Sequence, residues 1–400
     1  MTNSKPAPIV RLSLARGAHD LVRTLLELPG HGPVARIPHG DGHAWIVSGP
    51  ELVCEVLRDT AAFSKEGRHA PPYFVDESGL IGSAETSVAS DIVTSEGAEH
   101  LRLRKLHLLA LSPARVRSWE PTVATVTAQL LDALAEQRGK AVDLVAGLAY
   151  PLPLDIICVL LGLPRELHAT IRAASEDIFY GGSAAVRDRG RGRLYGTIGE
   201  LIDRQPDRIG AGLITDLLTL TRTDPPRASL VEVKAWIPSL VLPGHESTAS
   251  LLSSALYELL RAPRRTADVD AIVEETLRLH PPFPLATWRF ATHACTLSDV
   301  DIPAGAPVLV NLATVGHDPR VHPEPGEFRP ERDPIDHVTF GLGAHYCVGA
   351  GLARLEARTA IAAFLDRFPD ARLADPDAPP DWQSDLLSRR LATLPARLTP

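Results

Sequence analysis

The ten residues 340–349, FGLGAHYCVG, constrain the fold more than any other part of the chain. They follow a Pro-rich passage and run into a stretch with helical periodicity at 348–368, so Cys347 is predicted to lie at the N-terminal end of a helix. The N–H groups and positive dipole end of a helix favour an anion and lower the pKa of a thiol. The glycines around the cysteine, which permit close backbone approach, are Gly341, Gly343 and Gly349. The loop therefore predicts a thiolate ligand with a flat molecule resting against it.

These ten residues match the haem-binding loop F-G-x-G-x-H-x-C-x-G of the cytochrome P450 superfamily at every fixed position, and the chain resembles that family. The resemblance implies that Cys347 is the axial ligand of the iron of haem b, and that Phe340, Gly341, His345 and Gly349 contact the haem. A thiolate opposite dioxygen pushes electron density towards iron and favours cleavage of the O–O bond. From the residues alone, the alternative is a buried free cysteine beside a Gly-rich turn.

Haem carries two propionates, and a closed pocket needs cations or hydrogen-bond donors for them. His100 and Arg104 lie four residues apart and share one helical face. The resemblance implies that this pair, together with Arg289 and His345, holds the propionates. Each of the four residues could instead lie on the surface.

Glu275 and Arg278 are three residues apart and share a helical face. Such pairs usually lie on solvated surfaces, but the resemblance implies a structural pair that supports the core on the haem side. In the family, an Arg placed just before a Phe often completes this network. Here Glu327 precedes Phe328, so Arg329 or Arg332 has to supply the charge.

Residues 242–248, LPGHEST, are similar to the distal-helix motif A-G-x-[DE]-T-T of the family. A carboxylate beside a hydroxyl can relay protons through ordered water. The resemblance implies catalytic roles for Glu246 as the acid and Ser247 as the alcohol, with Gly244 and Thr248 beside them. Alternatively, Ser247 or Thr248 caps a helix that restarts here.

Two residues depart from this motif. Ser247 replaces the usual Thr and keeps the hydroxyl, but it lacks the β-methyl group that restricts rotation. Pro243 replaces a small residue and removes one backbone N–H, so the helix is predicted to open beside Gly244. Our hypothesis is that a widened groove favours oxidative coupling or ring formation over hydroxylation.

Periodicity predicts a fold that is mainly α with a small β region. The β-rich portions are predicted at about 30–65 and 290–315, and the helical bulk at 98–282 and 348–368. Helices are predicted at 98–110, 114–137, 146–162, 165–179, 190–205, 231–261 and 268–279. Hairpins are predicted from 34–37 with 44–47, and from 294–297 with 308–312.

No linker or repeat divides the sequence, so residues 1–400 are predicted to form a single domain. The resemblance covers nearly the whole chain. It implies the cytochrome P450 fold, a triangular prism with the haem between a distal and a proximal helix.

The substrate-recognition segments of the family map onto mostly apolar residues, which suggests a small hydrophobic or aromatic substrate. The pocket residues implied are Tyr73, Phe74, Phe179, Tyr180, Leu240, Pro243, Phe283, Leu285 and Ala286. Aromatic residues at such loops are as often engaged in local packing.

The formal charge of −8 and the absence of a basic arm argue against a nucleic-acid partner. No apolar run reaches the roughly 20 residues that span a bilayer, so a cytoplasmic protein without membrane contact is predicted. The four cysteines are scattered and suggest neither a zinc site nor a disulfide framework.

The leading interpretation is a bacterial haem-thiolate monooxygenase that uses dioxygen in secondary-metabolite biosynthesis. No flavin or ferredoxin sequence is appended, so a separate ferredoxin and ferredoxin reductase are expected to supply electrons, with Arg354 and Arg358 as candidate docking residues. The alternatives are an oxidative coupling or ring-forming enzyme on the same haem chemistry, and a non-catalytic haem-binding sensor.

Overall fold

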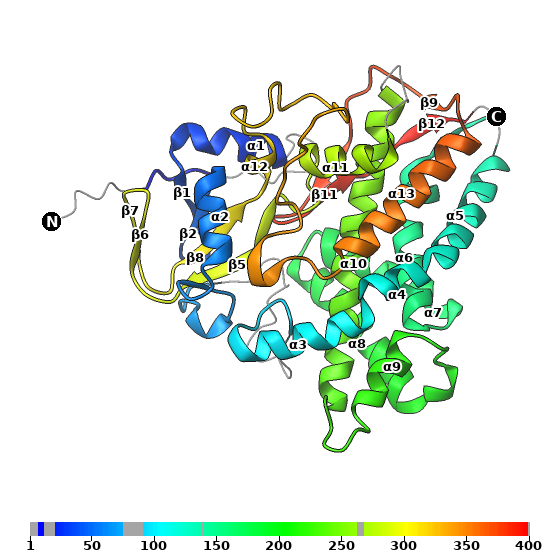
Figure 1. Ribbon diagram of the computed structural model, residues 1–400, viewed down its shortest axis with the longest axis horizontal. Coiled ribbons are helices and arrows are strands. Elements are labelled where there is room, and N and C mark those ends of the chain that lie inside the picture. Colours follow the sequence, from blue (N-terminus) through cyan, green and yellow to red (C-terminus); the bar gives the residue numbers. More distant parts are fainter. Residues whose placement is uncertain (1–6, 12–20, 75–90, 138, 262–267, 399–400) are drawn as a thin grey trace.

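The computed structural model describes residues 7–11, 21–74, 91–137, 139–261 and 268–398 (Figure 1). These residues form a mainly helical body with a smaller β region, the fold class predicted from periodicity. In Figure 1 the strands β1, β2, β5 and β8 lie at the left beside α1 and α2, and the long helices fill the right. Among the described residues, no helix combines the length and apolar character needed to cross a membrane.

The elements have the following bounds. The helices are α1 (Leu21–Glu27), α2 (Pro50–Arg58), α3 (Gly97–Ala110), α4 (Pro113–Ser118), α5 (Glu120–Ala135), α6 (Pro151–Leu161), α7 (Arg165–Tyr180), α8 (Ala184–Arg204), α9 (Leu213–Leu220), α10 (Leu230–Arg261), α11 (Val269–Leu279), α12 (Ala313–Gly316) and α13 (Ala350–Arg367). The strands are β1 (Val34–His39), β2 (Gly42–Val47), β3 (Phe63–Ser64), β4 (Ala141–Asp143), β5 (Leu285–Ala291), β6 (Cys295–Leu297), β7 (Val300–Ile302), β8 (Pro307–Asn311), β9 (Arg372–Leu373), β10 (Trp382–Ser384), β11 (Arg389–Leu391) and β12 (Pro395–Arg397).

Most predicted helices are present, and prolines and caps explain where the boundaries differ. The stretch predicted at 114–137 is divided into α4 and α5, because Pro121 lies in the first turn of α5 and cannot donate a backbone hydrogen bond. The stretch at 146–162 begins with a π-helical turn before Pro151 starts α6. Helix α8 begins at Ala184, earlier than predicted, where the Ser183 hydroxyl caps it.

The main sheet has the strand order β1-β2-β8-β5-β3. The hairpin β1–β2 forms as predicted, whereas the second predicted hairpin is wrong. Strand β6 pairs with β7 through a tight turn in which Ser298 and Asp299 have positive φ, and β8 pairs with β2 and β5 instead. The alternation of apolar and polar residues within a short strand does not determine which distant strand it pairs with.

Helix α10, 32 residues long, packs against α6, α8, α11 and α13 and positions the site from the centre of the molecule. Pro238 and Pro243 both lie inside it, yet the helix is unbroken. The predicted opening beside Gly244 is therefore wrong. Each proline removes a single backbone donor, and burial of the helix along its length outweighs that loss.

A buried charge network ties α11 to the Pro-rich passage before the Cys347 loop. Arg278 donates to Glu275 at 2.7 and 2.8 Å, and both side chains are fully buried. Arg278 also bonds the carbonyl oxygens of Gly316, Pro325 and Glu327. These bonds hold a segment without regular structure against the core.

Arg332 supplies the third charge that the sequence left open. Its Nε lies 3.1 Å from Glu275 Oε1, whereas the Arg329 side chain pairs with the exposed Glu324 and Glu331. Arg329 contributes only its backbone N–H, 2.8 Å from Glu275 Oε1.

Replacing Arg332 with Ala is expected to lower the free energy of unfolding by about 2–3 kcal/mol, because a buried carboxylate loses one of its cations. The matched control, Arg329→Ala, removes only exposed ion pairs and is expected to cost less than about 0.5 kcal/mol. Urea denaturation of both variants measures the difference. Equal losses would contradict the assignment of Arg332 to the network.

Candidate functional site

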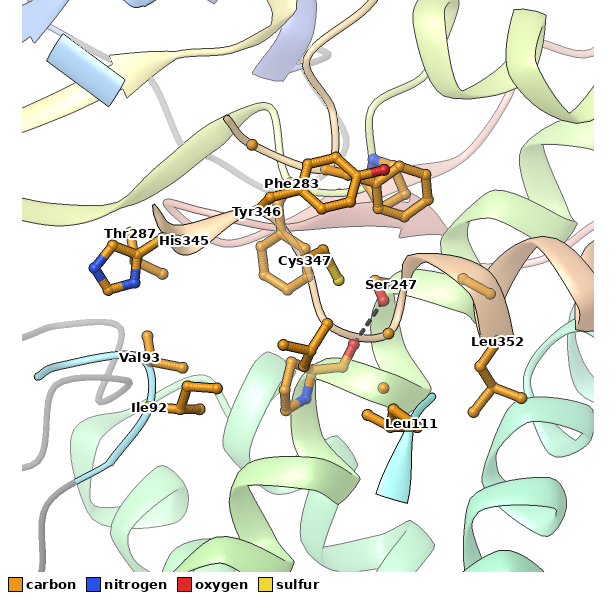
Figure 2. Close-up of a pocket in the computed structure, with 18 of the residues that line it drawn as sticks. Ile92, Val93, Leu111, Ser247, Phe283, Thr287, His345, Tyr346, Cys347 and Leu352 are labelled. Carbon is orange, nitrogen blue, oxygen red and sulfur yellow. Dashed lines mark hydrogen bonds between the residues drawn. The ribbon is translucent and has the colours of Figure 1, made fainter. Parts of the chain in front are cut away.

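A cavity of about 310 Å³ lies between α10 on one side and the Cys347 loop with the start of α13 on the other (Figure 2). Residues of α3, α6 and β5 are also part of its walls. The lining is mostly apolar, with Cys347 on one wall and a group of cationic and imidazole side chains among the remaining polar residues. Apolar pockets with a few convergent polar groups are the usual form of small-molecule sites.

The Cys347 loop is shaped by its backbone. Cys347 N donates to Phe340 O at 2.8 Å, and Gly341 and Gly343 both have φ of 73°, a conformation that side chains rarely adopt. Gly349 differs, because its φ is −89° and a Cβ there would lie 3.8 Å from Cys347 Sγ. Two of the three predicted glycine constraints are therefore conformational. At Gly349 the structure shows no such constraint, because a Cβ there would make an ordinary contact with the sulfur.

The Cys347 side chain lies just before α13, and its accessible surface belongs to the cavity that it lines. Burial raises the pKa of the Cys347 thiol, and the backbone N–H groups of Gly349 and Ala350 and the Arg104 charge lower it by less. The predicted lowering by the helix end is thus present, but desolvation outweighs it. A cation brought to the sulfur from the cavity would favour the thiolate.

His100, Arg104, Arg289 and His345 all line the cavity, as the resemblance implied for propionate contacts. The rings of His100 and His345 lie 4.1 Å apart. Burial lowers the pKa of His345 to about 4 and also lowers that of His100, so both imidazoles are neutral near pH 7. They provide hydrogen bonds, while the two arginines provide charge.

Two residues at this end of the cavity were missed from the sequence. Glu96 Oε2 lies 3.1 Å from His345 Nε2, and the buried Lys65 lines the cavity beside Thr287. Neither residue belongs to a recognisable motif. The pairing of β3 with β5 brings Lys65 to Thr287, and the Lys65 backbone N–H donates to Glu96. Both contacts join segments distant in sequence, so local patterns do not reveal them.

The donor set fits a haem. Cys347 offers a sulfur ligand on one wall, apolar walls suit a flat macrocycle, and cations with neutral imidazoles suit two carboxylates. The buried Arg289 Nε has no hydrogen-bond partner among the described residues, so a donor remains for such a carboxylate.

Five of the predicted substrate contacts line the cavity: Leu240, Pro243, Phe283, Leu285 and Ala286. The four aromatic residues predicted with them lie elsewhere, which corrects their assignment. Tyr73 donates to His43 O, and Phe74 packs on Trp288 and Phe290. Phe179 is buried in the helical core, and Tyr180 bonds Glu246. These rings serve packing, the alternative that the sequence left open.

Glu246 points away from the cavity and into a buried polar cluster. Tyr180 donates a short hydrogen bond to Glu246 Oε1, and Arg390 Nε lies 3.0 Å from the same oxygen. Arg390 also reaches Glu176 at 2.8 Å, and its guanidinium lies over the rings of Tyr150 and Tyr180. Burial raises the pKa of Glu246 to about 7, although Arg390 and Tyr180 lower it. The predicted acid thus titrates near neutral pH.

The predicted alcohols lie on the cavity side of α10. Ser247 Oγ donates to Pro243 O at 2.6 Å, the bond drawn in Figure 2, and Thr248 Oγ1 donates to Gly244 O at 3.1 Å. Because the helix is continuous, neither hydroxyl caps a restart. Gly244, Ser247 and Thr248 line the cavity, so the adjacent acid and alcohol of the motif face different environments.

The family model described as Cytochrome P450 matches residues 8–177 and 267–390. The cytochrome P450 monooxygenase PikC of Streptomyces venezuelae is 34% identical over 390 residues, which cover 95% of this chain and 91% of that protein. The 6-deoxyerythronolide B hydroxylase of Saccharopolyspora erythraea is 32% identical, with 95% and 96% of the two chains covered.

Among solved structures, the P450 enzyme CxnD, named for C–S bond formation in chuangxinmycin biosynthesis, superposes with a TM-score of 0.85. It is 26% identical, and 98% of each chain is covered. The likeness extends over nearly the whole length of both chains and confirms the fold that the resemblance implied.

Replacing Arg390 with Met is expected to raise the pKa of Glu246 above its value of about 7, because the guanidinium favours the carboxylate. The Glu176→Gln control is expected to shift this pKa downwards, since the negative charge of Glu176 raises it. Infrared titration of the protonated carboxyl band, assigned by its loss in Glu246→Gln, measures both shifts. An unchanged pKa in Arg390→Met would contradict the coupling.

Proposed function

The chain belongs to the cytochrome P450 family and is an oxygen-using oxidoreductase, and we propose that it oxidises a small hydrophobic or aromatic molecule in bacterial secondary-metabolite biosynthesis. The observation that carries this proposal is the apolar cavity with Cys347 on one wall and the Ser247 hydroxyl on another. The names of the relatives favour catalysis over the alternative of a haem-binding sensor.

We propose that the cofactor is haem b and that the Cys347 sulfur would hold its iron. Bound there, the cofactor supplies the activation of dioxygen that thiolate ligation favours. His100, Arg104, Arg289 and His345 hold its carboxylates, and Phe340 and Gly341 shape the surface of the loop beneath it. Arg354 lies over the Phe340 ring at 4.4 Å and keeps that side chain in place.

The substrate binds against the apolar wall of the cavity. Leu240 and Pro243 come from α10, Phe283 lies just before β5, and Leu285 and Ala286 begin β5. These side chains offer no hydrogen bonds, so they select apolar surface and exclude water from the reacting atoms.

Protons reach the cavity through α10. Ser247 Oγ is the last protein atom of the route, because it lines the cavity and a hydroxyl that donates to Pro243 O still accepts a hydrogen bond. Glu246 is the reservoir: its carboxyl titrates near neutral pH, and Oε2 has no hydrogen-bond partner among the described residues. A water between Oε2 and Ser247 would complete the route, and Arg390 with Glu176 leads towards solvent.

Electrons come from a separate ferredoxin and ferredoxin reductase. Arg354, one of the two predicted docking residues, donates to Glu274 at 2.6 and 2.8 Å. This pairing stabilises the Cys347 loop, so we assign Arg354 to the loop and not to ferredoxin docking. Arg358 keeps its proposed docking role. The cytoplasmic location expected from the sequence stays a prediction.

A second candidate is oxidative coupling or ring formation on the same cofactor. It rests on Pro243, whose ring is exposed to the cavity, and on the relative named for C–S bond formation. Both candidates use one site and differ in whether oxygen enters the product.

The two candidates are separated by turnover under labelled dioxygen. Ligands are first selected from a metabolite library by the shift that they cause in the haem absorption spectrum, and are then incubated with a ferredoxin, its reductase and labelled dioxygen. We expect one labelled oxygen atom per product molecule, measured by mass spectrometry. A product without label would contradict oxygen insertion and establish coupling.

The Ser247→Ala variant tests the proton route in the same assay. Product formed per reductant consumed is expected to fall roughly a hundredfold, because the last proton donor is lost. Ser247→Thr keeps the hydroxyl and serves as the matched control, with yield close to native. An unchanged yield in Ser247→Ala would remove Ser247 from the route.

A further inference from the structure

Lys65 is a nearly buried cation on the cavity wall that the proposed chemistry does not use. It follows β3, its exposed fraction is 7%, and it lines the cavity. Its backbone N–H donates to Glu96 Oε1 at 3.1 Å, and its Nζ donates a short hydrogen bond to Thr287 Oγ1 on β5. Glu96 thus fixes the backbone of Lys65, and Thr287 holds its ammonium.

Two buried cations, Lys65 and Arg289, lie together at this position. Burial, and to a smaller extent the neighbouring Arg289, lower the pKa of Lys65 to about 7. Burial also lowers the pKa of Arg289, to about 10. Glu96 is the nearby acid that favours both cations, and it is shared with His345. Asp91 acts more weakly on Lys65 and bonds Ser239 instead. A second buried anion would offset this cost.

Hydrogen-bond donors also remain available here. An ammonium has three donors, and within the described residues Thr287 is the acceptor recorded for Lys65 Nζ. Arg289 donates one bond to Phe63 O at 3.3 Å, while its buried Nε has no partner in the same residues. Two adjacent cations that still have unused hydrogen-bond donors are suited to bind a carboxylate, which accepts several charge-assisted hydrogen bonds.

We propose that Lys65, together with Thr287 and Arg289, forms a carboxylate-binding site in the cavity. Thr287 and His345, labelled in Figure 2, lie at the same end of the cavity as Lys65. The carboxylate comes either from a haem propionate or from an acidic substrate. The first of these sources rests on the proposed function. In both cases Lys65 is a positioning residue that no motif of the sequence indicates.

Replacing Lys65 with Met in the haem-loaded protein removes the charge and keeps the length of the side chain. If the site holds a propionate, haem transfer to excess apomyoglobin is expected to become at least about tenfold faster, because a charge-assisted hydrogen bond is lost. Lys65→Arg should restore the native rate. The control Lys105→Met removes an exposed lysine of α3 that is not part of the cavity, and it should leave the rate unchanged.

A second arm tests the substrate source with decanoic acid and decan-1-ol as probes. Their dissociation constants follow from the shift of the haem absorption band. If the site holds a substrate carboxylate, Lys65→Met is expected to weaken decanoic acid about tenfold or more, with decan-1-ol unchanged and haem transfer at the native rate.

Native haem transfer together with native binding of both probes in Lys65→Met would overturn the proposal. If Lys65→Met does not fold, Thr287→Val is measured in both arms, because it keeps the charge and removes the oxygen that positions it. Thr287→Val at native values in both arms would likewise overturn it. Failure of the native chain to bind haem is a separate result, which would contradict the proposed function.

Discussion

The position of Cys347 depends on two adjacent carboxylates of α11. Glu275 is buried with Arg278 and Arg332 and holds the Pro-rich passage against the core. Glu274 pairs with Arg354 of α13 and with His337, and these two partners lower its pKa to about 2 although burial opposes them. One carboxylate therefore fixes the chain before the loop and the other fixes the helix after it. The sulfur lies on the segment between them.

Much of this arrangement could be predicted because it is local. The sequence around Cys347 and the 3.6-residue periodicity placed the loop and most helices. The completion of the Glu275 network could not be predicted, since Arg329 and Arg332 are equivalent by sequence and differ only in burial. Lys65 and Glu96 could not be predicted for a related reason: the hydrogen bonds of Lys65 with Glu96 and Thr287 join segments that are distant in sequence.

On the α10 side of the cavity, the sequence motif predicted which residues are present but not the direction in which their side chains point. Glu246 and Ser247 are neighbours on a helix, so their side chains project about 100° apart. Ser247 therefore reaches the cavity while Glu246 reaches Arg390 on β11. The aromatic residues near this helix were predicted as substrate contacts, but Tyr180 instead completes the acid's buried environment. Which face a side chain occupies follows from the packing of α7, α10 and β11.

The cavity thus combines three environments: a sulfur on a loop held by α11, cations at one end, and an apolar wall from α10 and β5. Together these environments support the proposal that Cys347 is the iron ligand of a haem enzyme. The most direct measurement is the absorption spectrum of the reduced protein with carbon monoxide. The native chain should show the band of thiolate-ligated haem, and Cys347→Ser should lose it. A native spectrum typical of histidine ligation, or an unchanged band in Cys347→Ser, would contradict the account.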